Sequence, residues 1–162
     1  MRLRGTSSAA VLIGALALTG ALAGCSGTPA ARDSETREVT EAGQDSVFQI
    51  RVGDCTIDVP DGDASEVPVV PCAELHDNEV YYAFNMDGGA WPGETAVADA
   101  AAETCVAQFE KFIGISYDET ELEWWPITPT EGSWTALNDR EIYCLAYDPA
   151  APSTGSLSGA AR

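Results

Sequence analysis

The stretch "GETAVADAAAETCVAQFEKFIG", Gly93 to Gly114, decides the fold class because it is the one long segment with helical periodicity. Its apolar residues recur every three or four positions, which is the spacing of one face of an α-helix. They are Val97, Ala101, Cys105, Phe109 and Phe112. Lys111 lies near the end, where a positive charge favours the helix dipole, and glycine is a common stop. We therefore predict one main helix that begins near Glu94 and ends at Gly114.

The segments around this helix are short and favour β-strands. They are rich in β-branched and aromatic residues or alternate between apolar and polar positions. The prolines of the second segment suit an edge strand, and the stretch 129–134 is typical of a turn. The expected strands or extended segments cover residues 47–57, 67–72, 79–86, 121–130 and 141–148. This pattern predicts an α+β domain with an antiparallel sheet of about four to five short strands and one main helix.

The N-terminus has the pattern of an exported lipoprotein. Arg2 and Arg4 precede an apolar run over residues 9–22, and small residues follow, as in a secretory signal peptide. The run is shorter than the roughly 20 residues that a spanning helix needs. "LAGC", residues 22–25, resembles the bacterial lipobox, which implies removal of residues 1–24 and lipidation of Cys25 by diacylglyceryl and palmitoyl chains. More than one acyl chain gives stable membrane anchoring.

The charge of the chain excludes some partners. The full chain carries a formal charge of −18, and removal of Arg2 and Arg4 leaves 6 basic against 26 acidic residues, or −20. Such a chain repels nucleic-acid phosphates and does not lie flat on anionic lipid. It can attract a basic partner or cations, although solubility and spacing from the membrane are the simpler explanation.

Composition divides the mature chain into three parts. Residues 25–46 are poor in apolar side chains and predict a flexible tether behind the lipidated cysteine, and residues 149–162 predict a disordered tail. The folded domain is expected over residues 47–148. A domain of this size has a small core and benefits from covalent staples.

Four cysteines remain after Cys25: Cys55, Cys72, Cys105 and Cys144. An even number in a small exported domain predicts disulfides, and three pairings are possible. We prefer Cys55–Cys72, which closes the turn between two neighbouring strands, and Cys105–Cys144, which pins the helix to the last strand. Their wide spacing lacks the CxxC pattern of zinc and redox sites, so we expect neither a metal nor a cofactor.

His76 is the only histidine of the chain, and Asp77 follows it directly. As neighbours they point in different directions, so Asp77 is poorly placed to orient a catalytic imidazole. We expect His76 to be a structural residue at the entrance of the following strand, bonded to backbone. The alternative is an envelope hydrolase or cation-dependent enzyme that uses His76 and nearby carboxylates.

Two further features are candidates for structure or recognition. Arg140 is one of few basic residues in an acidic domain, and we expect it to pair with a carboxylate and tie the last hairpin. Trp124 and Trp125 are expected in the core, with an exposed edge of this pair as a second possibility for binding.

Several short motifs occur in a characteristic order along the chain. "GDC" (53–55) and "VPC" (70–72) are followed by "HDNEVY" (76–81), "WPG" (91–93) and "NDREIYC" (138–144). In this order and with four cysteines, the chain resembles the septum formation family of actinobacterial exported and membrane-linked proteins. Asn138 stands where that pattern usually has glycine, and asparagine tolerates the same left-handed turn. The resemblance implies a role in the cell envelope, linked to division, without implying an enzymatic activity.

The sequence therefore predicts a non-enzymatic, lipid-anchored module on the extracytoplasmic face of the cell membrane. Its expected partners are the membrane, through the lipid anchor, and an envelope or division protein. A small-ligand carrier is a further alternative, which requires an apolar cavity.

Overall fold

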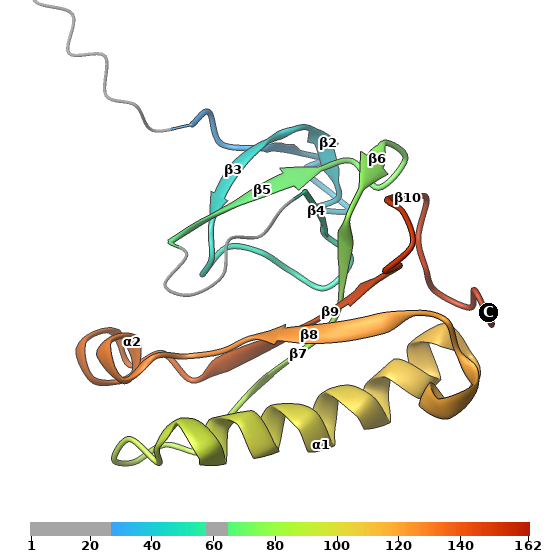
Figure 1. Cartoon of the computed structure of the whole chain (residues 1–162). Helices are drawn as coiled ribbons and strands as arrows, with labels where there is room; N and C mark the ends of the chain where they lie inside the picture. Colours follow the sequence, from blue (N-terminus) through green and yellow to red (C-terminus); the bar gives the residue numbers. More distant parts are fainter. Residues whose placement is uncertain (1–26, 58–64) are drawn as a thin grey trace, which may run out of the picture.

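Helix α1 packs along one face of a curled antiparallel sheet in the computed structural model, which describes residues 27–57 and 65–162 (Figure 1). The predicted signal peptide and Cys25 lie outside these residues. The described helices are α1, Glu94–Ile113, and α2, Glu131–Leu137, with a 3-10 turn η1 at Tyr117–Glu119. Neither α-helix of the described ranges combines the length and apolar character that crossing a bilayer requires.

Six strands form the main sheet, in the order β3-β5-β4-β7-β9-β8, with every neighbouring pair antiparallel. The strands of this sheet are β3 Gly43–Ser46, β4 Cys55–Thr56, β5 Glu66–Val70, β7 Asn78–Asn85, β8 Glu123–Ile127 and β9 Glu141–Tyr147. Two short ribbons accompany it, β1 (Ala31–Arg32) with β2 (Val39–Glu41) and β6 (Leu75–His76) with β10 (Ser153–Thr154). The α+β class is therefore as predicted, with a larger sheet and a second helix.

Helix α1 has the predicted bounds because its apolar face continues up to the glycine that ends the helix. Val97, Ala101, Cys105, Phe109 and Ile113 are buried at intervals of four residues. The helix ends at Gly114, whose φ of 94° is left-handed and whose N–H donates to the carbonyl of Glu110.

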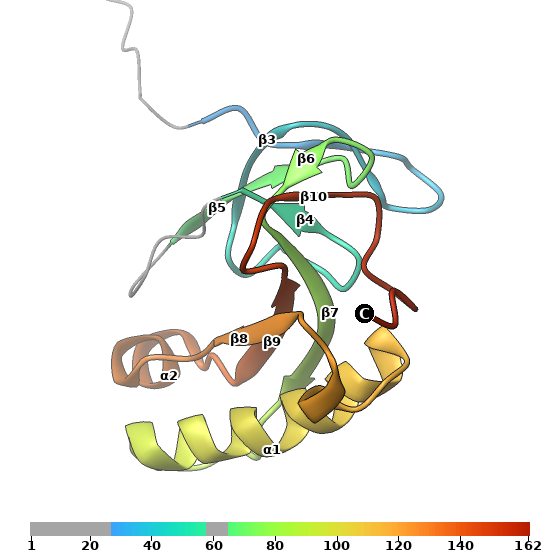
Figure 2. The ribbon, with the colours of Figure 1, turned by 45° about the vertical axis from the view of Figure 1, so that its right-hand side comes forward.

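Two apolar cores lie on opposite faces of the sheet. One core joins α1 to the half of the sheet made by β7, β9 and β8, and it includes the Cys105–Cys144 disulfide. The other lies between this half and the half made by β3, β5 and β4, around Val67, Val80 and Leu145. Figure 2 shows β7 curving from one half to the other, which is how a single sheet encloses the second core.

The segment 47–57 differs from its prediction, because only Cys55–Thr56 is a strand. Asp54 closes a turn instead: its N–H donates to the carbonyl of Arg51, and its carboxylate accepts the Arg51 N–H at 2.8 Å. The predicted apolar face is consequently split, since Ile50 is buried while Phe48 and Val52 are 49% and 57% exposed.

Two other predicted elements are corrected. Strand β5 lies between β3 and β4 instead of at an edge, and Pro68 still contributes its carbonyl oxygen, which accepts the Ile57 N–H. The predicted turn at 129–134 contains the start of α2. Thr130 and Ser133 form a reciprocal capping box, with both side-chain oxygens accepting a backbone N–H at 3.0 Å.

The predicted tether is folded over its described residues, which corrects the boundary at residue 47. Strand β3 pairs with β5 over Gly43–Ser46, and β1 and β2 form a ribbon beside it. A Cβ on Gly43 would lie 2.4 Å from the backbone nitrogen of Ala30, so glycine allows the preceding chain to lie against β3. Backbone hydrogen bonds and one buried ion-pair cluster hold this segment in place. Its small number of apolar residues does not predict either of them.

The predicted disordered tail also belongs to the fold. Strand β10 pairs with β6, with Ser153 opposite His76, and Leu157 is 4% exposed within the α1 core. The C-terminal residues return to α1, where the Gly159 N–H donates to the carbonyl of Phe112. A single buried leucine and a few polar bonds are enough to order a segment whose composition is typical of disorder.

Candidate functional site

The two disulfides have the preferred pairing. Cys55–Cys72 links β4 to the end of β5 with a Cα–Cα distance of 5.2 Å, and Cys105–Cys144 links α1 to β9 at 5.6 Å. Loops of 17 and 39 residues correspond to about 3 and about 4 kcal/mol of stabilisation in the loop-entropy description. These values are comparable with the total stability of a small domain.

His76 lies in β6, buried to 1% exposure, as expected of a structural residue bonded to backbone. Its Nδ1 is 2.9 Å from the carbonyl oxygen of Glu74, which can only accept, so Nδ1 carries the proton in the neutral ring. The other ring nitrogen, Nε2, has no hydrogen-bond partner among the described residues. Asp77 lies beside it in the chain, and its N–H donates to the carbonyl of Thr56 at 2.9 Å.

A ring nitrogen of His76, Sγ of Cys55 and a carboxylate oxygen of Glu79 lie within 4.8 Å of one another. Such a trio can bind a metal only if its donors are available. The Cys55 sulfur is bonded to Cys72. The two oxygens of Glu79 accept hydrogen bonds from Ser156 Oγ at 2.7 Å and from the Leu157 N–H at 2.6 Å. In the oxidised protein two of the three donors are therefore already engaged.

Glu79 has a structural role that sequence reasoning missed. Glu79 is 4% exposed, and both hydrogen-bond partners of its carboxylate belong to the C-terminal segment. A buried carboxylate requires such donors. Glu79 is part of the "HDNEVY" motif, so this motif anchors the end of the chain.

Arg140 forms no ion pair with a carboxylate among the described residues, where one was expected. Its guanidinium lies over the ring of Trp134 at 3.7 Å from the ring centroid. Its Nη1 donates to the carbonyls of Trp134 at 3.0 Å and Asp139 at 2.7 Å. These carbonyls lie at the C-terminal end of α2, where a positive charge is favourable. Arg140 therefore joins α2 to β9, and the expected tie is made through carbonyls and an aromatic ring instead of a carboxylate.

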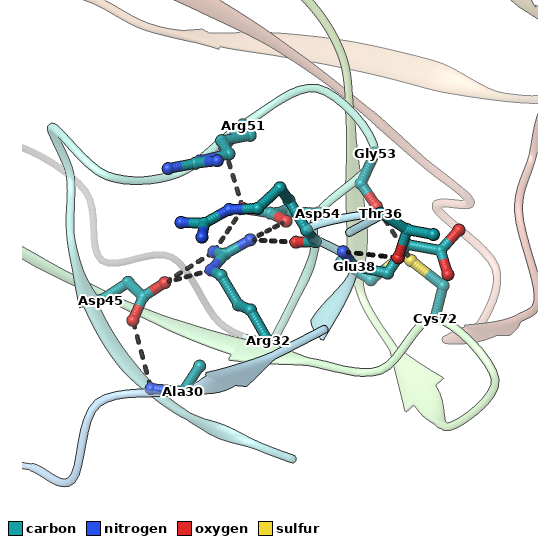
Figure 3. Close-up of polar contacts among 11 residues, drawn as sticks. Ala30, Arg32, Thr36, Glu38, Asp45, Arg51, Gly53, Asp54 and Cys72 are labelled. Atoms are coloured by element: carbon teal, nitrogen blue, oxygen red, sulfur yellow. Dashed lines mark hydrogen bonds and ion pairs between the residues drawn. A yellow bond between two sulfur atoms is a disulfide. The ribbon is translucent and has the colours of Figure 1, made fainter. Parts of the chain in front are cut away.

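The described part of the N-terminal segment contributes a buried cluster of Arg32, Asp45 and Asp54, shown in Figure 3. Arg32 Nη1 and Nη2 donate to the two oxygens of Asp54 at 2.7 and 2.8 Å, and Nη2 also donates to Asp45 at 2.6 Å. The Arg32 side chain is only 10% exposed. Hydrogen bonds from Arg32 to Asp54 raise the pKa of the guanidinium above its usual value, so it stays charged.

This cluster gives the "GDC" motif its function in the fold. Asp54 orders the turn before β4 through the N–H of Arg51 and, at the same time, holds β1 through Arg32 (Figure 3). The segment has only two basic residues, Arg32 and Arg37, among its acidic ones, and nothing in the sequence indicates which carboxylates Arg32 contacts.

Concave surfaces border α2 on several sides and make it the candidate binding surface. An apolar groove of about 200 Å³ lies between residues 47–48, the end of β8 and α2, with Tyr143 at its base. Phe48 and Leu137 line this groove and the neighbouring hollow beside Arg140, and they are 49% and 64% exposed. We call the surface formed by Phe48, Ile127, Leu137, Asp139 and Glu141 the α2 groove.

The tryptophan pair on β8 does not form the exposed edge that was considered as a binding feature. Trp124 and Trp125 are both half-buried, packed against the two different cores. The indole N–H of Trp125 donates to Asn78 Oδ1 at 2.7 Å. The most exposed large apolar side chains come instead from loops, from the short strand β6 and from the end of α2, where burial depends on the tertiary fold.

The sequence comparisons agree with the motif order. The profile of the septum formation family matches residues 52–160. A Mycobacterium bovis protein named as a lipoprotein, LppN, is 32% identical over 96% of this chain and 93% of its own length. The Mycobacterium tuberculosis protein of the same name is 32% identical over 68% of each chain. No solved structure matches the chain significantly.

Proposed function

Because the chain belongs to the septum formation family, we propose that it is an envelope lipoprotein anchored through Cys25 to the extracytoplasmic face of the membrane, where it acts as a non-enzymatic binding module. The names of its mycobacterial relatives support the lipoprotein assignment. The lipobox-like "LAGC" supplies the acceptor cysteine. The anchored domain would hold an envelope or division protein close to the membrane.

The α2 groove is the observation that carries this proposal. Two large apolar side chains, Phe48 and Leu137, stay about half exposed or more at its rim although the domain has two apolar cores. Asp139 and Glu141 add carboxylates to its wall, and the whole chain is strongly acidic. This combination suits a partner segment that presents an apolar side chain flanked by lysine or arginine.

The burial of His76 weighs against the hydrolase alternative. A general base must come within hydrogen-bond reach of a substrate, and a ring that is 1% exposed is shielded from one. Glu79, which has a carboxylate oxygen within 4.8 Å of a ring nitrogen of His76, is engaged by the C-terminal segment.

Photo-crosslinking in cells tests the binding surface. A photoreactive residue at Leu137 is expected to trap an extracytoplasmic protein with a basic, apolar segment. The same residue at Leu75 is the matched control, because this side chain is 62% exposed but lies on β6, outside the α2 groove. The purified partner should then bind the wild type and Leu75→Glu equally, and Leu137→Glu at least tenfold more weakly. Equal trapping at both positions contradicts the assignment.

The anchor is tested separately. We expect Cys25→Ser to lose incorporation of labelled palmitate and to move from the membrane to the soluble fraction, while Cys105–Cys144 and the fold remain intact. Membrane retention of this variant without acyl label would contradict anchoring through Cys25.

A further inference from the structure

The two disulfides differ sharply in access. Cys105 and Cys144 are both 0% exposed, so no reagent reaches either sulfur in the folded protein. Cys55 is likewise 0% exposed, but Cys72 is half-buried and lies on the wall of a cavity of about 440 Å³. The Cys55–Cys72 bond therefore joins a fully buried inner cysteine to one that lines a space large enough for a thiol group.

The imidazole ring beside the inner cysteine carries an unused proton acceptor. Because His76 donates through Nδ1 to the carbonyl of Glu74, Nε2 of the neutral ring carries a lone pair, and it has no partner within the described residues. The ring lies within 4.8 Å of Cys55 Sγ. Opposite charges at such a distance stabilise one another, so a Cys55 thiol released here can transfer its proton to His76 and remain as the thiolate.

We propose that Cys55–Cys72 is a thiol-exchange site, in which a partner thiol attacks Cys72, Cys55 is the leaving group, and His76 is the base that reactivates Cys55. This activity is independent of the α2 groove, which lies at other elements of the fold. It requires no CxxC spacing, because the tertiary fold supplies the neighbouring histidine.

The steps balance as ordinary thiol–disulfide exchange. A partner thiolate attacks Cys72 Sγ, the bond to Cys55 breaks, and Cys55 leaves with the electron pair, giving a mixed disulfide at Cys72. A second thiol on the partner then displaces Cys72, so the dithiol is oxidised to a disulfide as both protein cysteines are reduced. In the reverse direction the Cys55 thiol gives its proton to His76 Nε2, the thiolate attacks the mixed disulfide at Cys72, and the partner thiolate leaves.

The cavity also selects the charge of the partner. Glu38 is exposed on its wall, and Glu79 lies deeper beside Ser156. A negative wall disfavours anionic thiols and favours neutral or cationic ones. The expected partner is a dithiol on a neutral or basic molecule.

The two disulfides of the wild-type full chain provide the first test, because one serves as the control for the other. The protein is treated with dithiothreitol at neutral pH without denaturant, alkylated at intervals, and mapped peptide by peptide by mass spectrometry. We expect Cys55 and Cys72 to be labelled at least tenfold faster than Cys105 and Cys144. Equal rates, or labelling of Cys55 and Cys72 only in denaturant, overturn the proposal.

Variants in which one of the two cysteines is replaced test which sulfur the partner attacks. Cys55→Ser leaves Cys72 free, and we expect it to form a mixed disulfide with cystamine, a cationic disulfide, faster than with the anionic oxidised glutathione. Cys72→Ser leaves only the inner Cys55 and should react at least tenfold more slowly. Equal reactivity of the two variants contradicts the assigned roles.

The role of His76 is tested by reoxidation. His76→Gln is expected to slow closure of the mixed disulfide about tenfold, whereas Glu74→Gln, which keeps the backbone carbonyl, should close at the wild-type rate. An unchanged rate in His76→Gln removes the histidine from the proposal. If that variant fails to fold, the pH dependence of closure in the wild type decides the same point. The rate of closure should rise with pH in a single step, at a lower pH than the one at which a free thiol ionises.

Discussion

Arg32 and Asp54 form a two-point ion pair, with Nη1 to Oδ1 at 2.7 Å and Nη2 to Oδ2 at 2.8 Å. One residue lies in the segment that leads from the N-terminus, and the other lies in the "GDC" motif at the start of β4. The segment between the predicted lipid anchor and the family domain is therefore attached to that domain by a charged contact (Figure 3).

Removal of the Arg32 guanidinium should destabilise the protein strongly. Arg32→Ala leaves the carboxylates of Asp45 and Asp54, with side chains 7% and 5% exposed, without their shared cation. Breaking one side of a buried ion pair costs about 3 kcal/mol or more. We expect a loss of this size in the free energy of unfolding, measured by urea denaturation.

Arg51→Ala is the matched control, because it removes the same charge from an exposed side chain in the turn that Asp54 closes. Its effect should stay within about 0.5 kcal/mol. A loss in Arg32→Ala no larger than in Arg51→Ala would show that the cluster does not hold the N-terminal segment.

Glu79 should control the order of the C-terminal segment. Glu79→Gln places an amide where both Ser156 Oγ and the Leu157 N–H now donate to oxygens. At least one donor loses its acceptor, which costs about 1–3 kcal/mol for a buried group. We expect faster amide hydrogen exchange in residues 153–162, with α1 unaffected.

Glu74→Gln is the corresponding control, since this side chain is exposed in the same region. Exchange that increases equally in both variants would mean that the tail is held without Glu79.

His76 should behave as a structural residue in equilibrium unfolding. His76→Ala empties a fully buried site and removes the bond to the carbonyl of Glu74, so we expect a loss of about 2 kcal/mol and a lower melting temperature. Leu75→Ala on the same strand, 62% exposed, should change stability by less than about 0.5 kcal/mol. If His76→Ala were as stable as wild type while an envelope phenotype was lost, the ring would instead face a partner.

Alkaline pH should destabilise the protein through its phenols. A hydrogen bond to the Glu123 carboxylate, with some burial, raises the pKa of Tyr117 to about 12 from an ordinary value of 10.0. A raised folded-state pKa favours the protonated form, so its stabilisation is complete below pH 10 and is lost as pH rises toward 12. Burial raises the pKa values of Tyr81 and Tyr143 as well, which extends the loss to higher pH.

Tyr117→Phe separates the contribution of Tyr117 to this alkaline destabilisation from those of Tyr81 and Tyr143. The variant should lose less unfolding free energy than the wild type between pH 10 and pH 12, while phenolate absorbance locates the titration. An identical pH dependence in the two proteins would exclude Tyr117 as its source.

Local patterns predicted the elements whose side chains carry a strong periodicity. The bounds of α1, the strand at β7 and the final strand β9 follow from apolar spacing and a glycine stop, and the disulfide pairing followed from which elements the cysteines occupy. Prediction failed where polar bonds replace apolar burial, as in the capping box of α2 and in the turn that Asp54 closes.

The candidate sites were likewise predicted only in part. The sequence singled out His76 as unusual and Arg140 as a tie. It could not show that carbonyls and an aromatic ring would contact Arg140. Nor could it show that the ring of His76, with Nε2 unpartnered among the described residues, would lie beside the inner cysteine of a disulfide. Such contacts join residues far apart in the chain, and no local spacing encodes them.

By itself, the sequence determined that this is an acidic chain with the pattern of a signal peptide, a lipobox-like cysteine, an α+β domain with four further cysteines and the motifs of its family. Those properties depend on residue type, order and short-range periodicity. Only the tertiary structure decided that both terminal segments belong to the fold, through Arg32 with Asp54 and through Glu79 with Leu157. It also decided which apolar side chains remain exposed at the α2 groove, because burial depends on which distant segments meet.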